Sequence, residues 1–381
     1  MSLAKKLITM VNYLIPKTNI VLLSSFPAFS DNAQALYIYL QQERPDICER
    51  YRLVWAQNEM EQVQAVELQK KGCFVKKNSL KGIWYFLRAR YVISTHNYFS
   101  NVRSPRGQYQ INLWHGCGYK AITKADRCYR GDYTLATGDI YRSIQSSELG
   151  IPETNVWVTG FPRNDILFRP ACSLEQLGIR KSEYQKVLIW MPTFRKAKFG
   201  HEELDGSEDS FSLSSMTSKE IEELDRVLQD EGFLLLVKPH PMDATSFERT
   251  EGLAHIRCIT NEDMVRKNIP LYELLAQTDV LLSDYSSVIV DYLLLDKPIA
   301  MVLSDMESYR SSRGFVFENV EEYLPGPIIT DLPGLRDYLR RMGQINAEWE
   351  QKRMELKGCF HKYWDDGSCR RVAEEIFRLD K

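Results

Sequence analysis

The chain has 381 residues, a formal net charge of −2, 44% hydrophobic residues and 26% charged residues. This length exceeds that of one ordinary compact core and predicts two domains. The residue balance is that of a globular protein, and the small net charge excludes attraction of nucleic acid by the protein as a whole.

The cysteines and the apolar runs further limit the kinds of protein that this sequence can encode. The eight cysteines contain no Cys-x-x-Cys pair and no zinc-type spacing with histidine. We therefore interpret them as free thiols in a reducing cytoplasm and predict no metal site. No apolar run approaches the roughly 20 residues of a transmembrane helix. We also expect no secretory signal, because no small-residue cleavage site follows the first apolar stretch.

The N-terminal segment is predicted to be an amphipathic helix. Its apolar residues recur at helical spacing beside lysines, namely Leu3, Leu7, Ile8, Met10, Val11, Leu14 and Ile15 with Lys5, Lys6 and Lys17. Two interpretations remain open. The helix lies on an anionic membrane surface, or its apolar face packs on its own domain.

From Asn19 onward, short β-branched runs alternate with amphipathic stretches in two cycles. The first cycle predicts strands at Ile20–Ser24, Arg52–Gln57, Tyr91–Thr95, Tyr109–Trp114, Tyr133–Thr137 and Val156–Thr159. The second predicts strands at Val187–Pro192, Phe233–Lys238, Ile256–Ile259, Val280–Ser283 and Ile299–Leu303. Predicted helices are Met60–Lys71, Leu80–Arg90, Lys219–Asp230, Leu271–Gln277, Ser286–Leu295, Leu335–Phe360 and Ser368–Arg378.

This alternation predicts an α/β protein with two Rossmann-like, doubly wound domains. We place the N-terminal domain at residues 1–165, the second domain at 166–360, and a C-terminal helix at 361–381 that packs back on the first domain. A linker is expected within Phe161–Tyr184, and the acidic, serine-rich segment Gly200–Ser218 is expected to be a mobile surface loop. We expect the two domains to face a cleft, where the carboxyl ends of their strands bind ligands.

The segment Trp114-His115-Gly116-Cys117 ends a strand of the first domain. A histidine there suits a general base for a hydroxyl nucleophile, and Gly116 lets another group approach the backbone. Cys117 could be a nucleophile or a small turn residue, and no base is predicted beside it. The other histidines lack comparable context and are interpreted as structural or surface residues, namely His96, His201, His255 and His361.

Two arginines occupy turns of interest. Arg195 follows the first strand of the second domain, and an arginine at such a position suits bidentate phosphate contact. Arg163 and Asp165 lie in the predicted linker. For these two, an ion pair that holds the linker explains the residues as well as substrate contact does.

The segment Lys238-Pro239-His240-Pro241 follows an apolar strand of the second domain. Its prolines fix the backbone, and Lys238 and His240 could neutralise charge that develops on a diphosphate. A structural role for His240 is the alternative.

The segment Ser283–Ser287, which we call the serine turn, lies between a buried strand and an apolar helix. Backbone N–H groups and hydroxyls at Ser286 and Ser287, next to Asp284, favour an anion such as phosphate. Plain helix capping explains the serines equally well. Asp291, inside the apolar helix, must find a buried partner.

Taken together, several segments resemble the CDP-glycerol glycerophosphotransferase family, whose members build teichoic acids and capsular polymers. The matching segments are NLWHG, VTGFPRNDIL, VLIWMPTFRK, VKPHP, LLSDYSSVIVDYLLLDKPI, DMESYRSSRGFVFE, YLPGP and WDDGSCRRVAEEI. They keep the family's order from about Val92 onward, and SSFPAFSDNAQALYIYL is similar to the family's opening strand, loop and helix.

The resemblance implies a glycosyltransferase-B-like protein whose second domain holds a CDP-polyol and whose first domain receives the acceptor. It maps the family's functional histidines onto His115, as the general base, and His240, beside the diphosphate. It maps phosphate contacts onto Arg195, Ser286 and Ser287. An acceptor hydroxyl is then expected to attack the donor's β-phosphorus and expel CMP.

The resemblance also implies the partners. The donor is CDP-glycerol or CDP-ribitol, and the acceptor is a lipid-linked saccharide or a polyol phosphate. No cofactor is implied, and dependence on Mg²⁺ is not decided. The protein is expected to be peripheral on the cytoplasmic face of the bacterial membrane.

Two departures from the family pattern lie in the first domain. Cys117-Gly118-Tyr119 stands where the family has a Thr-Pro-like sequence, and Phe26-Pro27-Ala28 stands where its opening loop has a glycine. Both leave the acceptor open. The short chain favours a priming enzyme over a polymerase. The alternatives are a nucleotide-sugar-dependent glycosyltransferase or epimerase on the same scaffold, and a non-catalytic anion-binding relative.

Overall fold

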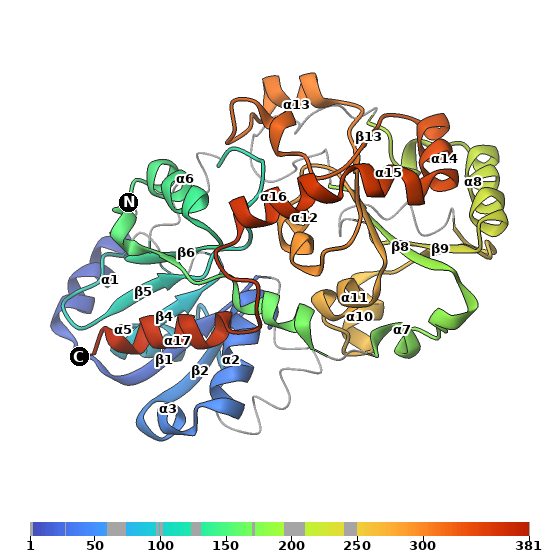
Figure 1. Cartoon of the computed structure of the whole chain (residues 1–381). Helices are drawn as coiled ribbons and strands as arrows, with labels where there is room; N and C mark the ends of the chain where they lie inside the picture. The colour runs from blue at the N-terminus through green and yellow to red at the C-terminus, as the bar shows by residue number, and fades with distance from the viewer. Residues whose placement is uncertain are drawn as a thin grey trace. The chain divides into compact units, whose positions relative to one another are not determined.

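The computed structural model describes residues 3–26, 28–58, 74–96, 99, 102–122, 131–169, 172–193, 210–239 and 250–380. The chain forms two compact units (Figure 1). Unit 1 comprises Met1–Cys117, Ile122–Asp165 and Phe360–Lys381, and unit 2 comprises Gly118–Ala121 and Ile166–Cys359. Each unit is built on one parallel sheet, which confirms the α/β class.

Unit 1 contains a seven-stranded sheet in the order β3-β2-β1-β4-β5-β6-β7. Its strands are β1 Thr18–Ser24, β2 Arg52–Gln57, β3 Phe74–Lys76, β4 Ala89–Ser94, β5 Tyr109–Asn112, β6 Tyr133–Ala136 and β7 Val156–Val158. Its α-helices are α1 Leu3–Leu14, α2 Asp31–Glu43, α3 Pro45–Arg50, α5 Leu80–Arg88, α6 Asp139–Leu149 and α17 Ser368–Arg378. The 3₁₀ helices are η2 Glu153–Asn155 and η3 Pro162–Phe168, which runs across the boundary to unit 2.

Helices cover both faces of this sheet. Successive strand residues point to opposite faces. Val92 of β4 belongs to a core cluster with Phe86 and Leu87 of α5, against which α1 packs. The neighbouring Tyr91 meets Phe377 of α17 at 5.4 Å between ring centroids. The C-terminal helix is therefore part of the fold of unit 1.

Unit 2 contains a six-stranded sheet in the order β10-β9-β8-β11-β12-β13. Its strands are β8 Lys186–Met191, β9 Phe233–Val237, β10 Ile256–Cys258, β11 Val280–Ser283, β12 Ile299–Val302 and β13 Ile328–Ile329. Its α-helices are α7 Ser173–Gln176, α8 Ser218–Asp230, α10 Asn261–Arg266, α11 Leu271–Gln277, α12 Val288–Tyr292, α13 Met306–Ser312, α14 Leu332–Arg340, α15 Met342–Glu348 and α16 Glu350–Phe360. The 3₁₀ helices are η4 Lys181–Glu183, η5 Leu213–Ser215, η6 Leu293–Leu295 and η7 Val320–Tyr323.

Both sheets reverse their strand order once, between β1 and β4 in unit 1 and between β8 and β11 in unit 2. In doubly wound sheets, ligands bind outside the carboxyl ends of the strands at such a switch point. The two switch points are therefore the places where each unit is expected to bind a ligand.

Several predicted segments have a different outcome. The helical tail predicted over Leu335–Phe360 is divided into α14, α15 and α16. Leu213 and Met216, from the second half of the expected surface loop, are buried in the core of unit 2, so the loop prediction is wrong there because both apolar side chains fill that core. Residues 200–209 and the predicted helix Met60–Lys71 lie outside the described residues. The single helix expected over Ser286–Leu295 is instead the short α12 followed by η6, which ends at Asp296 with a φ of 55°.

Candidate functional site

The histidine loop, Leu113–Cys117, follows β5 in unit 1 and is held from beneath by a buried amide. Asn32 of α2 donates from Nδ2 to the Leu113 carbonyl at 3.2 Å and to the Trp114 carbonyl at 3.1 Å. Trp114 has a φ of 57° and Gly116 a φ of 137°. A non-glycine residue in the left-handed region is held there by its surroundings, and such strain is concentrated at functional sites.

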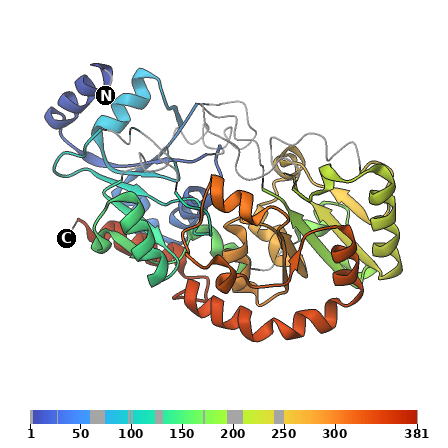
Figure 2. The same ribbon diagram turned by 90° about the horizontal axis from the view of Figure 1, so that it is seen from above.

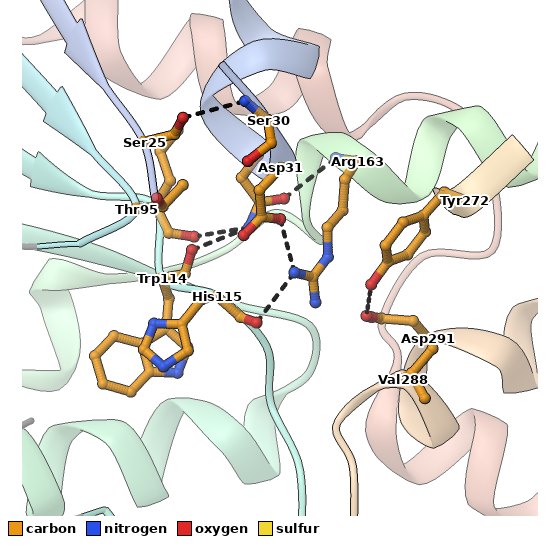
Figure 3. A network of polar contacts seen from close by, with 12 residues as sticks. Ser25, Ser30, Asp31, Thr95, Trp114, His115, Arg163, Tyr272, Val288 and Asp291 are labelled. Carbon is orange, nitrogen blue, oxygen red and sulfur yellow. Dashed lines mark hydrogen bonds and ion pairs between the residues drawn. The ribbon is translucent and has the colours of Figure 1, made fainter. Parts of the chain in front are cut away.

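Arg163 fixes the next residue of the loop. Its Nη1 donates to the His115 carbonyl at 3.0 Å and pairs with Asp31 Oδ1 at 2.7 Å, as Figure 3 shows. The side chains of Arg163 and Asp31 are only 8% and 14% exposed. A buried, hydrogen-bonded ion pair of this kind is costly to break on one side, so it holds the backbone of His115 firmly.

Asp165 has different partners from Arg163. Its two oxygens accept the Ser368 and Cys369 backbone N–H groups, each at 2.8 Å, at the start of α17. Burial raises the pKa of this carboxyl, and the two amide bonds act in the opposite direction. The geometry gives Arg163 a role at the histidine loop and Asp165 a role in attaching the C-terminal helix.

The His115 ring is stacked with two other rings. The Trp114 ring lies 4.5 Å away at 29°, and the His96 ring lies 4.6 Å away at 20°, both measured between centroids and ring planes. His96 follows β4, and β4 pairs with β5 in a register that aligns Ser94 with Asn112. His96 was interpreted from the sequence as structural or surface, because strand adjacency was not known. Cys117 is buried, and its Sγ accepts from Gln145 Nε2 at 3.3 Å.

The serine turn lies at the switch point of unit 2, between the ends of β8 and β11. Ser283 Oγ donates to the Met191 carbonyl at 2.7 Å. Asp284 Oδ2 accepts the backbone N–H of Thr193 at 2.9 Å and its hydroxyl at 2.7 Å. The carboxylate of Asp284 therefore joins the ends of two neighbouring strands.

Ser286 and Ser287, both half-buried, lead into α12. The Ser286 and Ser287 carbonyls accept the first helical N–H groups, at 3.2 Å from Ile289 and 3.1 Å from Val290. The side chain of Ser287 makes no capping bond to α12. The alternative of simple capping therefore does not account for the Ser287 hydroxyl.

Asp291 and Lys238 are both buried and both have neutral partners in unit 2. Tyr272 Oη donates to Asp291 Oδ2 at 2.5 Å. Lys238 Nζ donates to Asn261 Oδ1 at 2.8 Å, and burial lowers the pKa of this lysine to about 8. Arg195 and His240, the other predicted donor-side residues, lie outside the described residues.

The segment Gly118–Ala121 belongs to unit 2, although it directly follows the histidine loop. It lies antiparallel to residues 314–316, with hydrogen bonds from the Ala121 N–H to the Gly314 carbonyl and from the Val316 N–H to the Tyr119 carbonyl. Tyr119 is fully buried and donates to the Tyr323 carbonyl at 3.1 Å. A Cβ on Gly118 would lie 3.0 Å from Ser287 Cα. This contact with the serine turn was not predicted from the sequence.

In the part of the chain that the structure describes, no cluster of three or more His, Cys, Asp or Glu side chains could hold a metal ion. Within the same residues, every helix is too short or too polar to cross a membrane.

The family model and the individual relatives that match this chain indicate the same family. The model of the family described as CDP-Glycerol:Poly(glycerophosphate) glycerophosphotransferase matches residues 7–378. A teichoic acid glycerol-phosphate transferase of Staphylococcus aureus is 25% identical over 96% of this chain and 94% of its own length.

Two solved structures share the fold. A variant of the wall teichoic acid polymerase TagF matches with a TM-score of 0.75 and 21% identity, over 98% of this chain and 93% of that one. A putative UDP-N-acetylglucosamine 2-epimerase of Listeria monocytogenes matches with a TM-score of 0.57 and 12% identity, over 95% of this chain and 97% of that one. Both likenesses concern the fold, which is of the glycosyltransferase-B-like kind with two Rossmann-like domains.

Proposed function

Because the chain belongs to the CDP-Glycerol:Poly(glycerophosphate) glycerophosphotransferase family, we propose that it transfers glycerol phosphate from CDP-glycerol to an acceptor hydroxyl in teichoic acid synthesis. The observation that carries the proposal is the family match over residues 7–378, which includes both candidate sites. CMP is the leaving group.

His115 is the general base in this proposal. The acceptor oxygen attacks the phosphorus that bears glycerol, the bond from that phosphorus to the CMP oxygen breaks, and the acceptor proton passes to the imidazole. Transfer to a positioned base contributes typically 10²- to 10⁴-fold to a rate. The Arg163 bond to the His115 carbonyl supports this role, since it fixes the loop without occupying the ring.

The donor diphosphate belongs at the switch point of unit 2, where Ser286 and Ser287 supply hydroxyls and backbone N–H groups. Arg195 and His240 complete this proposed set, and Lys238 contributes positive charge from its buried position. Asp284 acts from behind the turn, by holding Thr193 against it. Asp291 supports the following helix through Tyr272. Phosphoryl transfer depends mainly on such positioning and charge stabilisation.

A donor panel tests the reaction. CMP release is measured with CDP-glycerol, CDP-ribitol and UDP-sugars, each with a lipid-linked saccharide acceptor. We expect turnover with a CDP-polyol, and product chains of one or few units if the protein is a primase. UMP or UDP formed only from sugar donors would favour the glycosyltransferase alternative, and binding without turnover would favour the non-catalytic relative.

His115→Gln tests the base. We expect kcat to fall at least about 100-fold with little change in KM for the donor. His255→Gln, in unit 2, is the matched control and should leave kcat unchanged. Full activity of His115→Gln contradicts the assignment.

Peripheral membrane attachment through α1 is the second part of the proposal. Ile8 and Val11 pack against the core of unit 1, whereas Leu7, Met10 and Leu14 are 57%, 59% and 75% exposed. The helix thus has one apolar face on its own domain and a second one in solvent. The sequence left open whether the helix packs on its own domain or lies on a membrane. Packing on the domain concerns the first of these faces, and membrane attachment concerns the second.

The neighbouring helix α5 also exposes apolar side chains. α1 and α5 lie side by side (Figures 1 and 2). Leu80 and Trp84 of α5 are exposed, and the Arg88 guanidinium lies over the Trp84 ring at 5.5 Å. Exposed apolar and aromatic side chains with cations beside them suit the interface of an anionic membrane.

Point substitutions test this surface better than removal of α1. Asn12 is buried and bonds to Gln108, and Lys17 bonds to the Leu87 carbonyl, so truncation would disturb the core. The triple variant Leu7→Ser, Met10→Ser and Leu14→Ser should sediment at least about tenfold less with vesicles of anionic lipid. CDP-glycerol affinity should not change. Met354→Ser, an exposed methionine of unit 2, is the control, and unchanged sedimentation of the triple variant contradicts the membrane role.

A further inference from the structure

We propose that His96 is a positioning residue for His115, and that Thr95 keeps it a neutral imidazole with the proton on Nε2. The inference rests on the proposed role of His115 as the base. It concerns only residues of unit 1, at the carboxyl ends of β1, β4 and β5.

The hydrogen bonds of Thr95 determine the tautomer of His96. The Thr95 side chain is fully buried, and its Oγ1 accepts the Phe26 backbone N–H at 3.2 Å. Oγ1 also lies 3.1 Å from His96 Nδ1. A buried hydroxyl donates its proton to an acceptor, and His96 Nδ1 is the acceptor that the described residues offer it. Nδ1 is then unprotonated, and the ring proton of His96 is on Nε2.

Because the two imidazoles are stacked, the protonation state of His96 affects proton transfer to His115. The rings are nearly parallel, with centroids 4.6 Å apart. When His115 takes the acceptor proton it becomes a cation, and the face of a neutral ring accommodates a cation. A protonated His96 would instead place a like charge beside it and oppose the proton transfer. The Thr95 hydroxyl disfavours this, because its own proton is directed at Nδ1 in the proposed arrangement and would have to turn away.

Two further charged groups lie near the His96–His115 pair. Arg163 of η3 reaches the His115 carbonyl, and Asp31 of α2 pairs with Arg163, so these two largely compensate one another. Phe26 of the loop after β1 touches the His96 ring edge-on at 5.5 Å. Thr95 and His115 are thus two direct neighbours through which the state of His96 is influenced.

The first experiment reads the tautomer directly. Histidine ring nitrogens are labelled with ¹⁵N in the full-length protein, whose six histidines give few signals. His96→Phe and His115→Gln assign the two rings. We expect the Nε2–H tautomer for His96 at pH 7.5 and a mixture of tautomers in Thr95→Val. An Nδ1–H tautomer in the unmodified protein overturns the inference.

The second experiment is a double-mutant cycle on CMP release. Thr95→Val should lower kcat about tenfold at pH 7, because His96 can then compete for the proton. In a His96→Phe background, where the ring cannot become charged, Thr95→Val should cost less than about twofold. Loss of the Phe26 contact is common to both backgrounds and cancels. An equal cost in both backgrounds means that Thr95 acts only in packing, and the inference fails.

The two proposals fail in different ways. If His115→Gln keeps full activity, the base assignment is wrong whatever the tautomer of His96. If His115→Gln is inactive and His96 shows neither the tautomer nor the coupling, only the present inference is wrong.

Discussion

Buried carboxylates around the two sites bind protein groups. Asp31 holds Arg163, Asp165 holds the start of α17, Asp284 holds Thr193 and Asp291 holds the Tyr272 hydroxyl. Each is paired as a buried polar group must be. In the proposed reaction, imidazole, hydroxyl and backbone N–H groups meet the substrate, and this suits the approach of an anionic phosphate.

Asp165→Ala should lower the free energy of unfolding without a direct effect on the transfer reaction. It leaves the Ser368 and Cys369 amides buried without their carboxylate, a change that costs about 2–3 kcal/mol. Urea unfolding followed by circular dichroism measures this, with the exposed Asp366→Ala as the control. If the variant keeps its stability and loses CMP release, Asp165 contacts substrate instead.

Lys238 gives a pH-dependent prediction. Burial lowers its pKa from 10.5 to about 8, so between these values the unfolded state binds more protons than the folded state. The contribution of Lys238 to the unfolding free energy therefore rises from pH 8 toward 10.5, by an amount on the order of 3 kcal/mol, and its full cost applies below pH 8.

The comparison with Lys238→Met isolates this contribution. The unfolding free energy of the unmodified protein minus that of the variant should increase between pH 7.5 and 10. Lys219→Met, at an exposed position of α8, should show a constant difference. A constant difference for Lys238→Met as well would contradict the lowered pKa.

At this scale, the sequence indicated which residue types end the strands but not which residues they meet. His115 and the serine turn were predicted from their position after apolar strands. Asp284 and Thr193 are 91 residues apart in the chain, and their contact depends on β8 and β11 being neighbours. The same reason explains why His96 was missed, since β4 and β5 had to be adjacent.

Among the elements, the segment Gly118–Ala121 makes a direct contact with the proposed donor site. It is fixed to residues 314–316 by backbone bonds and by the buried Tyr119. Gly118 has no side chain, and this lets its backbone lie against Ser287.

Gly118→Ala should therefore weaken donor binding. The added Cβ would lie 3.0 Å from Ser287 Cα and 3.3 Å from its backbone nitrogen, so the serine turn must shift by a few tenths of an ångström. We expect KM for CDP-glycerol to rise at least about fivefold, since overpacking of this kind costs roughly 1–3 kcal/mol and about 1.4 kcal/mol corresponds to a tenfold change. Gly343→Ala, which meets nothing within 4 Å, is the control. An unchanged KM would mean that Ser287 does not contact the donor.

The strands were the elements best predicted from sequence. β2 and β11 have the predicted bounds, and the other predicted strands differ by one or two residues at either end. β3 and β13, which are three and two residues long, were not predicted. The buried turn at Leu213 was also missed. Its two core residues, Leu213 and Met216, lie in an acidic, serine-rich stretch of sequence that is typical of a surface loop.

The whole molecule is not a simple succession of two units. The chain leaves unit 1 at Asp165, builds most of unit 2, and returns from Phe360 to complete unit 1. The returning helix α17 fully buries Val372, Ala373 and Ile376, and Asp380 pairs with Arg90. The amphipathic pattern of the last helix was visible in the sequence, but the partner of its apolar face was not.

This threading predicts that residues 1–165 fold only when the C-terminal segment is supplied. Burial of a valine and an isoleucine contributes about 1.5–3 kcal/mol each, and the surface beneath α17 adds more, against a typical domain stability of about 5–15 kcal/mol. Residues 1–165 alone should lack a cooperative thermal transition. The same residues joined to 360–381 through a flexible Gly/Ser linker of about 20 residues should unfold cooperatively, and Ile376→Asp in that fusion should abolish the transition. Cooperative unfolding of residues 1–165 alone would show that α17 is an accessory to unit 1.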